Sequence, residues 1–494
     1  MSEQSLKNKA VKGIVWKSIN TFGKLGVSFI VSIILARKLM PADYGAIAMI
    51  AVFTSVLDIF TDGGLTTAIV RKENRTETDK CTLFYYNLVA SYIIYVIIFT
   101  AAPLIANFYQ MPILCKLARV MSLGLLINPF ASIQSIHFTI NIDFKTPAYI
   151  SLSCTVISAI IAIWMAYNGY GVWALTVPTL FTSVIGTIVK IIIVRWYPRS
   201  RFSWDSFKEL FGFSSKLLGV EIINRIYNNI TPLIVGKFFS PAQLGLYEKA
   251  KGWPSLPSET FTSVLQGVTF PVLSKMQDDT ERLAANYRRI IKLSAFIVFP
   301  IVIGLAAVAK PMTIVLVTEK WIDSVLLMQL ICFSMMWYPI HAINLNLLLV
   351  TGHSEYTFKL EIIKKAWGLI VLCTALPFGL IVFCAAGIIS SYVSLFINTW
   401  YTKKIINFGF WEQLRDLLPI LGNCLTMGVI CLAVQYPFDN HFIKLLLGIP
   451  IAIIYYIISA RYLNREQFNE IIDIIALKLP KLSKYHILNS ATLL

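Results

Sequence analysis

The sequence predicts an all-α integral membrane protein with about fourteen transmembrane helices, arranged as two pseudo-symmetric six-helix lobes followed by two additional C-terminal helices. Its 494 residues are 57% hydrophobic and only 14% charged, whereas soluble domains carry about 25% charged residues. Apolar stretches long enough to cross a bilayer recur along the whole chain. A short motif also occurs twice, two hundred residues apart, and this repeat indicates the two lobes.

The apolar stretches give the predicted spans in order. Their approximate ranges are 13–36, 44–66, 83–106, 117–139, 148–168, 171–194, 210–236, 243–271, 290–309, 322–350, 360–378, 380–401, 416–436 and 441–460. The seventh and eighth are rich in polar residues. The last two have no counterpart in the other half of the chain, so we expect them to be appended to the two lobes.

Lysine and arginine in the connections predict the orientation, because cytoplasmic loops carry an excess of both. With the N-terminus inside, the inside connections hold 28 of the 43 such residues, the outside connections hold 10, and the spans hold five. We therefore expect both termini in the cytoplasm. Beyond Arg461, polar and apolar residues alternate at helical spacing, which predicts a helix on the membrane surface; a solvated tail is the alternative.

The repeated motif contains proline, alanine and glycine. Pro41-Ala42 and Gly45 follow the first span, and Pro241-Ala242 and Gly245 follow the seventh. Because six helices separate the copies, both halves cross the membrane in the same direction, as parallel repeats do. We expect an N-terminal lobe over residues 1–200, a C-terminal lobe over 201–405, and the additional helices with the amphipathic tail over 406–494.

Two spans at matched places carry a polar stripe. In the seventh span the stripe is Glu221, Asn224, Arg225, Asn228 and Thr231, and in the first it is Lys17, Asn20, Thr21, Lys24, Ser28 and Ser32. At about 100° per residue each set falls on one side of a helix. Unpaired polar groups in lipid cost several kcal/mol each. The stripes therefore face a polar seam between helices or a water-filled cavity, and their ionisable residues favour the cavity.

Other classes of site lack their sequence signals. The eight cysteines are scattered singly without metal-ligand spacing, so neither a metal site nor a disulfide framework is expected. No glycine-rich phosphate loop or nucleophile motif occurs, so we expect no enzyme and no cofactor. The net charge of +17 lies mainly in one set of connections, which argues against nucleic acid as a partner.

Several segments resemble the polysaccharide (O-antigen type) flippases of the multidrug/oligosaccharidyl-lipid/polysaccharide exporter superfamily. They are LARKLMPADYGAIAM from Leu35, Asp62-Gly63-Gly64 followed by AIVRK, VGKFFSPAQLGLYEKA from Val235, the stretch Val268 to Ser274, and Trp321. The resemblance spans roughly residues 5–400. It is good for the family and too generic to identify one glycan.

The resemblance implies a function. Members of that family move an undecaprenyl-diphosphate-linked oligosaccharide from the inner to the outer leaflet of the bacterial cytoplasmic (inner) membrane by alternating access of two six-helix lobes. This implies a role in lipopolysaccharide, capsule or exopolysaccharide synthesis, with membrane lipids, a polymerase and glycosyltransferases as partners. The related lipid II flippases have two extra helices that form a groove for the lipid tail, and the last two spans here are similar.

A diphosphate requires cationic ligands in a hydrated cavity. We expect Lys24 and Arg225 to hold it, with Asp58 or Asp62 as alternative partners of Lys24 and Glu221 as the alternative partner of Arg225. The further candidates are Lys17 and Lys216 near the inner end, Lys249 and Lys251 near the outer end, and Asn20, Asn224, Asn228 and Glu221 toward the sugars. The inner lysines alternatively extend to the membrane interface, and the outer ones alternatively start a solvated helix.

Asp58 and Asp62 are one turn apart in the second span. Buried carboxylates at this spacing bind a cation readily, so they are candidates for coupling transport to protons or sodium. The alternative is that Asp62-Gly63-Gly64 only ends the helix as a polar turn.

Two other functions compete with a flippase. A multidrug antiporter of the same superfamily would require an acidic, aromatic pocket for organic cations, for which Asp58 and Asp62 are too few. A membrane glycosyltransferase or polymerase would require paired acidic residues and a large external loop, and the outside connections are short.

Overall fold

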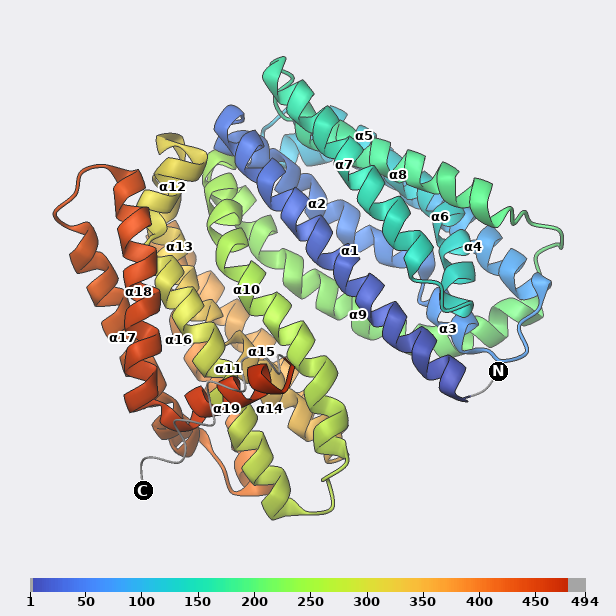
Figure 1. Cartoon of the computed structure of the whole chain (residues 1–494). Coiled ribbons are helices and arrows are strands. Elements are labelled where there is room, and N and C mark those ends of the chain that lie inside the picture. Colours follow the sequence, from blue (N-terminus) through green and yellow to red (C-terminus); the bar gives the residue numbers. More distant parts are fainter. Residues whose placement is uncertain (1–2, 479–494) are drawn as a thin grey trace. The chain divides into compact units, whose positions relative to one another are not determined.

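The computed structural model describes residues 3–478, and in this part of the chain the helices are joined by short connections without a β-strand (Figure 1). The all-α prediction is confirmed. The first part of the predicted tail forms α19 (Arg465–Lys478), and its remainder lies outside the described residues.

The helices of the first half are α1 (Glu3–Lys38), α2 (Pro41–Asp62), α3 (Leu65–Arg71), α4 (Glu77–Phe108), α5 (Ile113–Met121), α6 (Leu123–Ile140), α7 (Lys145–Tyr167), α8 (Trp173–Val194), α9 (Trp204–Phe238) and α10 (Pro241–Ser274). Those of the second half are α11 (Thr280–Ala307), α12 (Ala309–Val317), α13 (Ser324–Met335), α14 (Tyr338–Val350), α15 (Ser354–Ala375), α16 (Leu380–Ile406), α17 (Phe410–Gln435), α18 (His441–Leu463) and α19, with short 3₁₀ helices η1 (Glu319–Trp321) and η2 (Leu376–Phe378).

Within the described residues, 11 helical segments are long and apolar enough to cross a membrane. Each coincides with a predicted span. The other three predicted spans, at 210–236, 243–271 and 360–378, coincide with α9, α10 and α15, which are long helices with more polar residues. The chain is a multi-pass membrane protein, and the count of fourteen stays a prediction.

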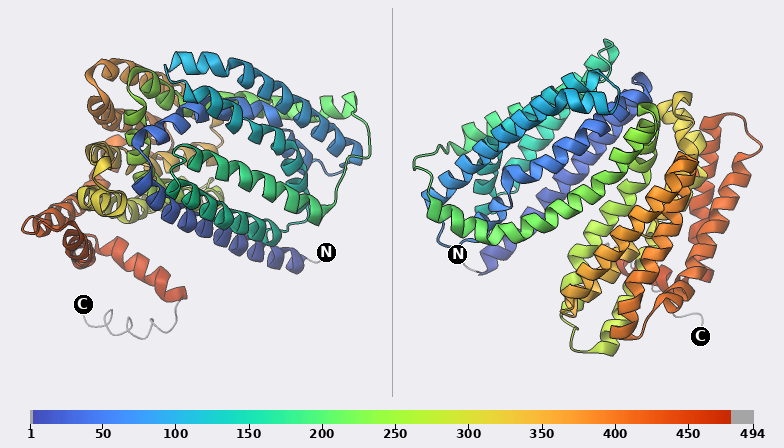
Figure 2. Two further views of the ribbon diagram at one scale, coloured as in Figure 1. Left: turned by 90° about the horizontal axis from the view of Figure 1, so that it is seen from above. Right: turned by 180° about the vertical axis from the view of Figure 1, so that it is seen from behind.

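Contacts divide the chain into two compact units, Met1–Glu248 and Lys249–Leu494. In the first unit, α1 packs along α7, α7 packs along α8, and α6 packs against both α8 and α4 (Figure 2). α9 packs against α2, α3 and α4. It therefore belongs to the first compact unit, although the repeat places it at the start of the second lobe. The lobe boundary at residue 200 rests on that repeat and stays a prediction.

The two copies of the repeated motif fold alike. α1 ends at Lys38 and α2 begins at Pro41, and α9 ends at Phe238 and α10 begins at Pro241, again two hundred residues apart. Proline suits the first position of a helix because its missing N–H has no helical partner there. The side chain two residues after each proline caps the helix: Asp43 accepts a hydrogen bond from the Met40 N–H at 2.9 Å, and Gln243 accepts one from the Ser240 N–H at 3.1 Å.

The two copies also pack directly on one another. A Cβ atom added to Gly45 would lie 2.7 Å from the carbonyl carbon of Pro241 and closer still to its oxygen. A Cβ atom added to Gly245 would lie 2.7 Å from the carbonyl carbon of Pro41 and likewise closer to its oxygen. The contact is thus reciprocal, as in a two-fold interface. Backbone meets backbone here, which only glycine permits.

In the second unit, α11 packs along α17, α17 packs along α18, and α13, α14 and α15 pack against α16. A buried hydrogen-bonded cluster joins four of these helices, α11, α14, α16 and α17. Tyr287 donates to the Asn344 side-chain oxygen at 2.7 Å, and Thr402 and Gln413 donate to the same oxygen at 3.0 Å and 3.1 Å. Because Gln413 belongs to α17, this cluster attaches the first of the two additional helices to α14 and α16.

Candidate functional site

The second span is interrupted at a pair of glycines. α2 ends at Asp62, Gly63 and Gly64 have φ angles of 57° and 76°, and α3 begins at Leu65. Glycine adopts positive φ without strain, unlike most residues, so the sequence itself fixes this interruption. The helix does end at Asp62, as the alternative interpretation of this segment required, and the coupling role of Asp58 and Asp62 stays a prediction. Interrupted membrane helices leave backbone groups outside the helical pattern, and transporters bind ions at such places.

The two aspartates beside this interruption line a cavity of about 300 Å³, the acidic cavity, together with Asn87, Ser91, Asn128, Ser135 and neighbouring residues. Asp58 Oδ1 accepts hydrogen bonds from Asn128 at 3.0 Å and from Thr61 at 3.1 Å. Asp62 accepts a hydrogen bond from Thr66. Neutral donors thus hold both carboxylates, and neither carboxylate is within ion-pair distance of a lysine or arginine among the described residues.

Two further oxygens in the acidic cavity are buried. Asn87 is 3% exposed and Ser91 is 0% exposed, and Asn87 Oδ1 and Ser91 Oγ have no hydrogen-bond partner among the described residues. Buried polar atoms are nearly always paired. Carboxylate, amide and hydroxyl oxygens together form a donor set suited to a hard cation.

A second cavity, the basic cavity, adjoins the first. It has a volume of about 320 Å³, and it shares Asn128 and Ala131 with the acidic cavity. Its other walls come from α1, α7 and α8, which contribute Asn20, Ser151, Cys154, Thr182, Ser183, Thr187 and Lys190. Lys190 donates a hydrogen bond to Ser135 Oγ at 3.0 Å, and Ser135 itself lines the acidic cavity.

Lys24 lies next to the basic cavity. It follows Asn20 by one helical turn and is half-buried, and its charge interacts with Lys190 and Cys154. The alternative partners Asp58 and Asp62 do not form an ion pair with it, since the described residues contain no ion pair of Lys24. Two lysines on membrane-spanning helices are therefore neighbours without an acidic partner.

Arg225 has a different environment. Its guanidinium lies 3.3 Å from the Glu221 carboxylate, and the two side chains are 43% and 54% exposed. Arg225 belongs to α9, and α9 is joined to α2 by Asn229, whose side-chain oxygen accepts a hydrogen bond from Ser55 at 3.0 Å. The intrahelical pair that the spacing allowed is therefore formed, and it neutralises part of the charge expected to bind a diphosphate.

The remaining predicted substrate residues are dispersed. Asn224 and Lys251 are half-buried, Lys17 and Asn228 are exposed, and the side chain of Lys216 lies outside the described residues. Lys249 is 8% exposed, and its ammonium lies 5.4 Å and 5.8 Å from the ring centres of Trp253 and Trp321. Such a cation–π arrangement stabilises a buried lysine.

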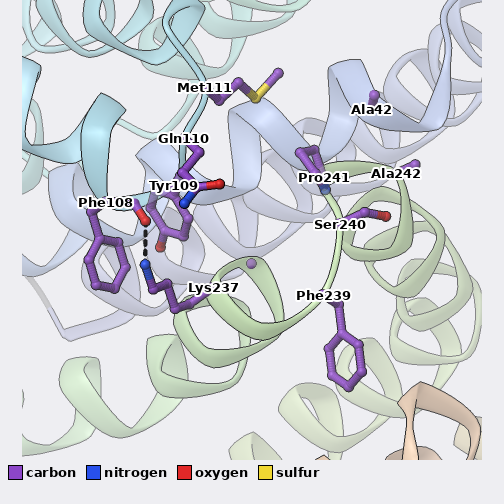
Figure 3. A pocket seen from close by; sticks show the side chains of 11 residues that line it. Ala42, Phe108, Tyr109, Gln110, Met111, Lys237, Phe239, Ser240, Pro241 and Ala242 are labelled. Atoms are coloured by element: carbon purple, nitrogen blue, oxygen red, sulfur yellow. Dashed lines mark hydrogen bonds between the residues drawn. The ribbon is translucent and has the colours of Figure 1, made fainter.

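A third cavity, of about 490 Å³, lies at the junction of the repeated motifs (Figure 3). Its walls come from the C-terminal ends of α4 and α9 and the starts of α2 and α10. Lys237 donates a hydrogen bond to the Phe108 carbonyl at 2.6 Å there. A cation at the last carbonyls of a helix stabilises that helix end. This lysine therefore has a structural role, and none of the predicted substrate residues lines this cavity.

Comparison with known proteins assigns the family. The model of a family described as "Polysaccharide biosynthesis protein" matches residues 34–326. The chain belongs to this polysaccharide biosynthesis family. One similar protein is the teichuronic acid biosynthesis protein TuaB of Bacillus subtilis (strain 168). It is 21% identical over 453 residues, which cover 89% of this chain and 91% of TuaB. Another is the lipopolysaccharide biosynthesis protein WzxC of Escherichia coli (strain K12), 22% identical over 373 residues that cover 73% of this chain and 74% of WzxC.

Solved structures assign the fold of this family member. The lipid II flippase MurJ, in an inward closed conformation, superposes with a TM-score of 0.70 at 17% identity, covering 91% of this chain and 99% of MurJ. An inward-facing multidrug resistance MATE family transporter of the MOP superfamily gives a TM-score of 0.59 at 15% identity, covering 80% and 99%. The chain therefore has the two-lobe fold of that superfamily.

Sequence reasoning missed part of the polar interior of this polysaccharide biosynthesis protein. Lys190 is one of the five basic residues inside the predicted spans and has no predicted role there, and Asn87, Ser91 and Asn128 are not among the predicted site residues. One signal was available for Lys190, which is the only charged residue of α8, because an ionisable residue inside a span indicates function. The asparagines and serines give no such signal, since their positions relative to Asp58 depend on how α2, α4 and α6 pack.

Proposed function

We propose that this protein is a flippase that moves an undecaprenyl-diphosphate-linked oligosaccharide from the inner to the outer leaflet of the bacterial cytoplasmic membrane by alternating access. The product serves lipopolysaccharide, capsule or exopolysaccharide synthesis. Support comes from the family, from relatives named for teichuronic acid and lipopolysaccharide biosynthesis, and from the MurJ-like fold. Both termini lie in the cytoplasm in this proposal, and glycosyltransferases and a polymerase act before and after transport. The protein itself is a transporter and catalyses no covalent step.

The observation that carries the proposal is unpaired positive charge inside the first unit. Lys24 and Lys190 belong to membrane-spanning helices, and they have no ion-pair partner among the described residues. Both side chains are half-buried, and charges that are partly withdrawn from water are normally paired because desolvation is costly. An anionic headgroup compensates such charges, whereas an organic cation is repelled by them.

The alternative function is export of organic cations, as in the multidrug branch of the same superfamily. The acidic cavity favours it, because Asp58 and Asp62 are ionisable. The aromatic component is missing, however, since neither the acidic nor the basic cavity is lined by an aromatic ring. Organic-cation sites depend on such rings for cation–π contacts. The flippase is therefore the better-supported function.

Within this function, Lys24 contacts the diphosphate, and Asn20, Asn224 and Asn228 contact sugars. Arg225 and Glu221 act as a pair at the exposed side of α9. Four further lysines attract the headgroup along its path: Lys17, Lys216, Lys249 and Lys251. The decisive experiment uses proteoliposomes that contain a labelled undecaprenyl-diphosphate oligosaccharide. Transport should be lost in Lys24→Gln and retained in Lys38→Gln, a control at the end of the same helix, where the ammonium lies 4.2 Å from the ring centre of Tyr167. Wild-type protein that leaves the labelled lipid in its original leaflet would disprove the proposed function.

The acidic cavity supports a second part of the proposal, in which Asp58 and Asp62 bind a proton or a sodium ion whose gradient drives transport. The interrupted helix and the two buried oxygens of Asn87 and Ser91 favour a cation there. Asp58→Asn and Asp62→Asn should make transport insensitive to the pH or sodium gradient. Asp43→Asn, in the same helix but at its cap, should leave the response unchanged. An unaltered gradient response in both cavity variants would refute the coupling role.

A further inference from the structure

Lys190 is unusual among the charges of the first unit. It is the only charged residue in α8, and α8 is one of the apolar spans. Its ammonium donates to a neutral hydroxyl, Ser135 Oγ, at 3.0 Å, and the described residues contain no carboxylate within ion-pair distance. A lysine inside a membrane usually pairs with an acidic group or lines a substrate path.

A second lysine is held beside it. α1 packs along α7, and α7 packs along α8. The contact of α1 with α7 is close at Gly23, where an added Cβ atom would lie 2.7 Å from Leu152 Cδ2. Close packing at Gly23 fixes the position of Lys24, the next residue, which lies one helical turn after Asn20, and Asn20 lines the same cavity as Lys190. Two positive charges at one cavity repel one another, so the site favours a ligand with more than one negative oxygen.

The cavity between these helices suits such a ligand in size and chemistry. Its volume of about 320 Å³ falls within the range of roughly 300–1,000 Å³ typical of small-molecule sites. Hydroxyl groups of Ser151, Thr182 and Thr187 line it beside Lys190. Asn20 Oδ1 is buried there without a hydrogen-bond partner among the described residues, so an acceptor is available for a hydroxyl or amide hydrogen next to an anion.

The nearby acidic groups do not neutralise this site. Asp58 lies in the adjoining cavity, and it accepts hydrogen bonds from Asn128 and Thr61. Asp62 accepts from Thr66. Asn128 lines both cavities and donates to Asp58, so a neutral side chain separates the acidic from the basic residues.

We propose that Lys24 and Lys190 together hold the diphosphate of the lipid-linked substrate in the basic cavity, with Asn20 accepting a hydrogen bond from the first sugar. This inference rests on the proposed function and assigns the second cationic ligand to α8 instead of α9. Arg225, which shares its charge with Glu221, is then dispensable for diphosphate binding. The ligand bridges α1 and α8 across α7 and replaces the mutual repulsion of the lysines with two charge-assisted hydrogen bonds.

Binding of undecaprenyl diphosphate to the full chain in nanodiscs tests this assignment. Lys24→Met and Lys190→Met should each weaken binding about ten- to hundredfold, as expected for loss of a hydrogen bond to a charged group. Lys190→Arg keeps the charge and should restore most of the affinity. Lys38→Gln, at the end of α1 beside Tyr167, is the matched control and should bind as wild type does. Arg225→Gln should also leave the affinity unchanged, because Glu221 already compensates that charge.

A second measurement uses the natural chain, so it does not depend on whether a variant folds. Cys154 lines the basic cavity, whereas Cys373 is exposed in the second unit. Undecaprenyl diphosphate should slow the reaction of a small thiol reagent with Cys154 and leave Cys373 unaffected. Undecaprenol without the diphosphate should protect neither cysteine.

The outcomes separate this inference from the proposed function. If wild type binds undecaprenyl diphosphate but both methionine variants bind it equally well, or Cys154 is not protected, the site assignment is wrong and the flippase function stands. If Arg225→Gln alone loses binding, the second ligand lies on α9 and the assignment is again wrong. If wild type binds no lipid diphosphate at all, the proposed function and this inference both fail.

Discussion

Gly45→Ala tests whether the two copies of the repeated motif must pack backbone to backbone. The added Cβ would lie 2.7 Å from the Pro241 carbonyl carbon, about 1 Å short of the optimal separation of two carbon atoms. The obstructing atoms are backbone atoms, so no side-chain rotation relieves the clash. The starts of α2 and α10 must therefore separate, and we expect a loss of about 1–3 kcal/mol of stability, typical of overpacking.

Because the contact is reciprocal, it also predicts the effects of Gly245→Ala and of the double variant. Gly245→Ala should cost about as much as Gly45→Ala, because its added Cβ meets Pro41 at the same distance. Once one substitution has separated the helices, the second meets less resistance, so the double variant should cost clearly less than the sum of the two. Such coupling is not expected for residues that pack independently.

Thermal and denaturant unfolding of the purified protein, monitored by tryptophan fluorescence, measures these changes. Gly212→Ala is the matched control in the same unit, since an added Cβ there has no neighbour within 4 Å. That control should stabilise its helix by roughly 0.5–1 kcal/mol, because alanine loses less conformational freedom on folding than glycine. If Gly45→Ala is as stable as Gly212→Ala, or if the two motif variants are strictly additive, the reasoning about this contact is refuted.

Three further predictions concern polar contacts outside the cavities. The hydrogen bond from Lys72 to Glu209, at 2.8 Å, raises the pKa of the Lys72 ammonium above its usual 10.5. The stability that this bond contributes is therefore fully present below pH 10.5 and is lost as the pH rises through the folded-state pKa. Glu209→Gln should flatten the fall of the thermal midpoint in this alkaline range, and an unchanged fall would contradict the assignment. Arg288 binds both carboxylate oxygens of Asp416 between α11 and α17. Because the arginine is 51% exposed, we expect Asp416→Asn to cost only about 1 kcal/mol in denaturant unfolding. Glu466→Gln should cost less, because the Glu466 carboxylate is 73% exposed, against 8% for Asp416, and lies 3.4 Å from Lys292. Tyr287→Phe removes a buried donor to Asn344 and should destabilise the protein by about 1–3 kcal/mol. Tyr436→Phe, at an exposed position, is the control and should have no measurable effect. Equal unfolding midpoints for these two variants would show that the buried cluster contributes nothing to stability.

The end of α2 at Asp62 is an example of a feature that the local sequence predicts. Asp62-Gly63-Gly64 predicts a polar turn, and α2 does end there with both glycines at positive φ. Local backbone preference is enough for that result, because few residues other than glycine adopt the conformation. The repeat was accessible for a similar reason, since helix starts at Pro41 and Pro241 follow from the residues themselves.

Partners on the same helix were accessible in this way, and partners on other helices were not. The spacing of Glu221 and Arg225 within one helix predicts their ion pair, and they form it. Lys24 could be assigned either to Asp58 or to a ligand, and its neighbour Lys190 is 166 positions away in the chain on α8. No periodicity within one segment identifies which helices pack together, so this neighbour appears only once α1, α7 and α8 are assembled.

The sequence by itself determined the membrane class, the helical fold, the interruption after Asp62 and the two copies of the Pro-Ala motif, because apolar length, glycine conformation and helix capping are properties of a few consecutive residues. Only the tertiary structure decided that the copies meet at Gly45 and Gly245, that Asp58 is held by Asn128, and that Lys24 has Lys190 for a neighbour. These are contacts between distant segments, and they depend on the packing of whole helices, which short-range patterns do not encode.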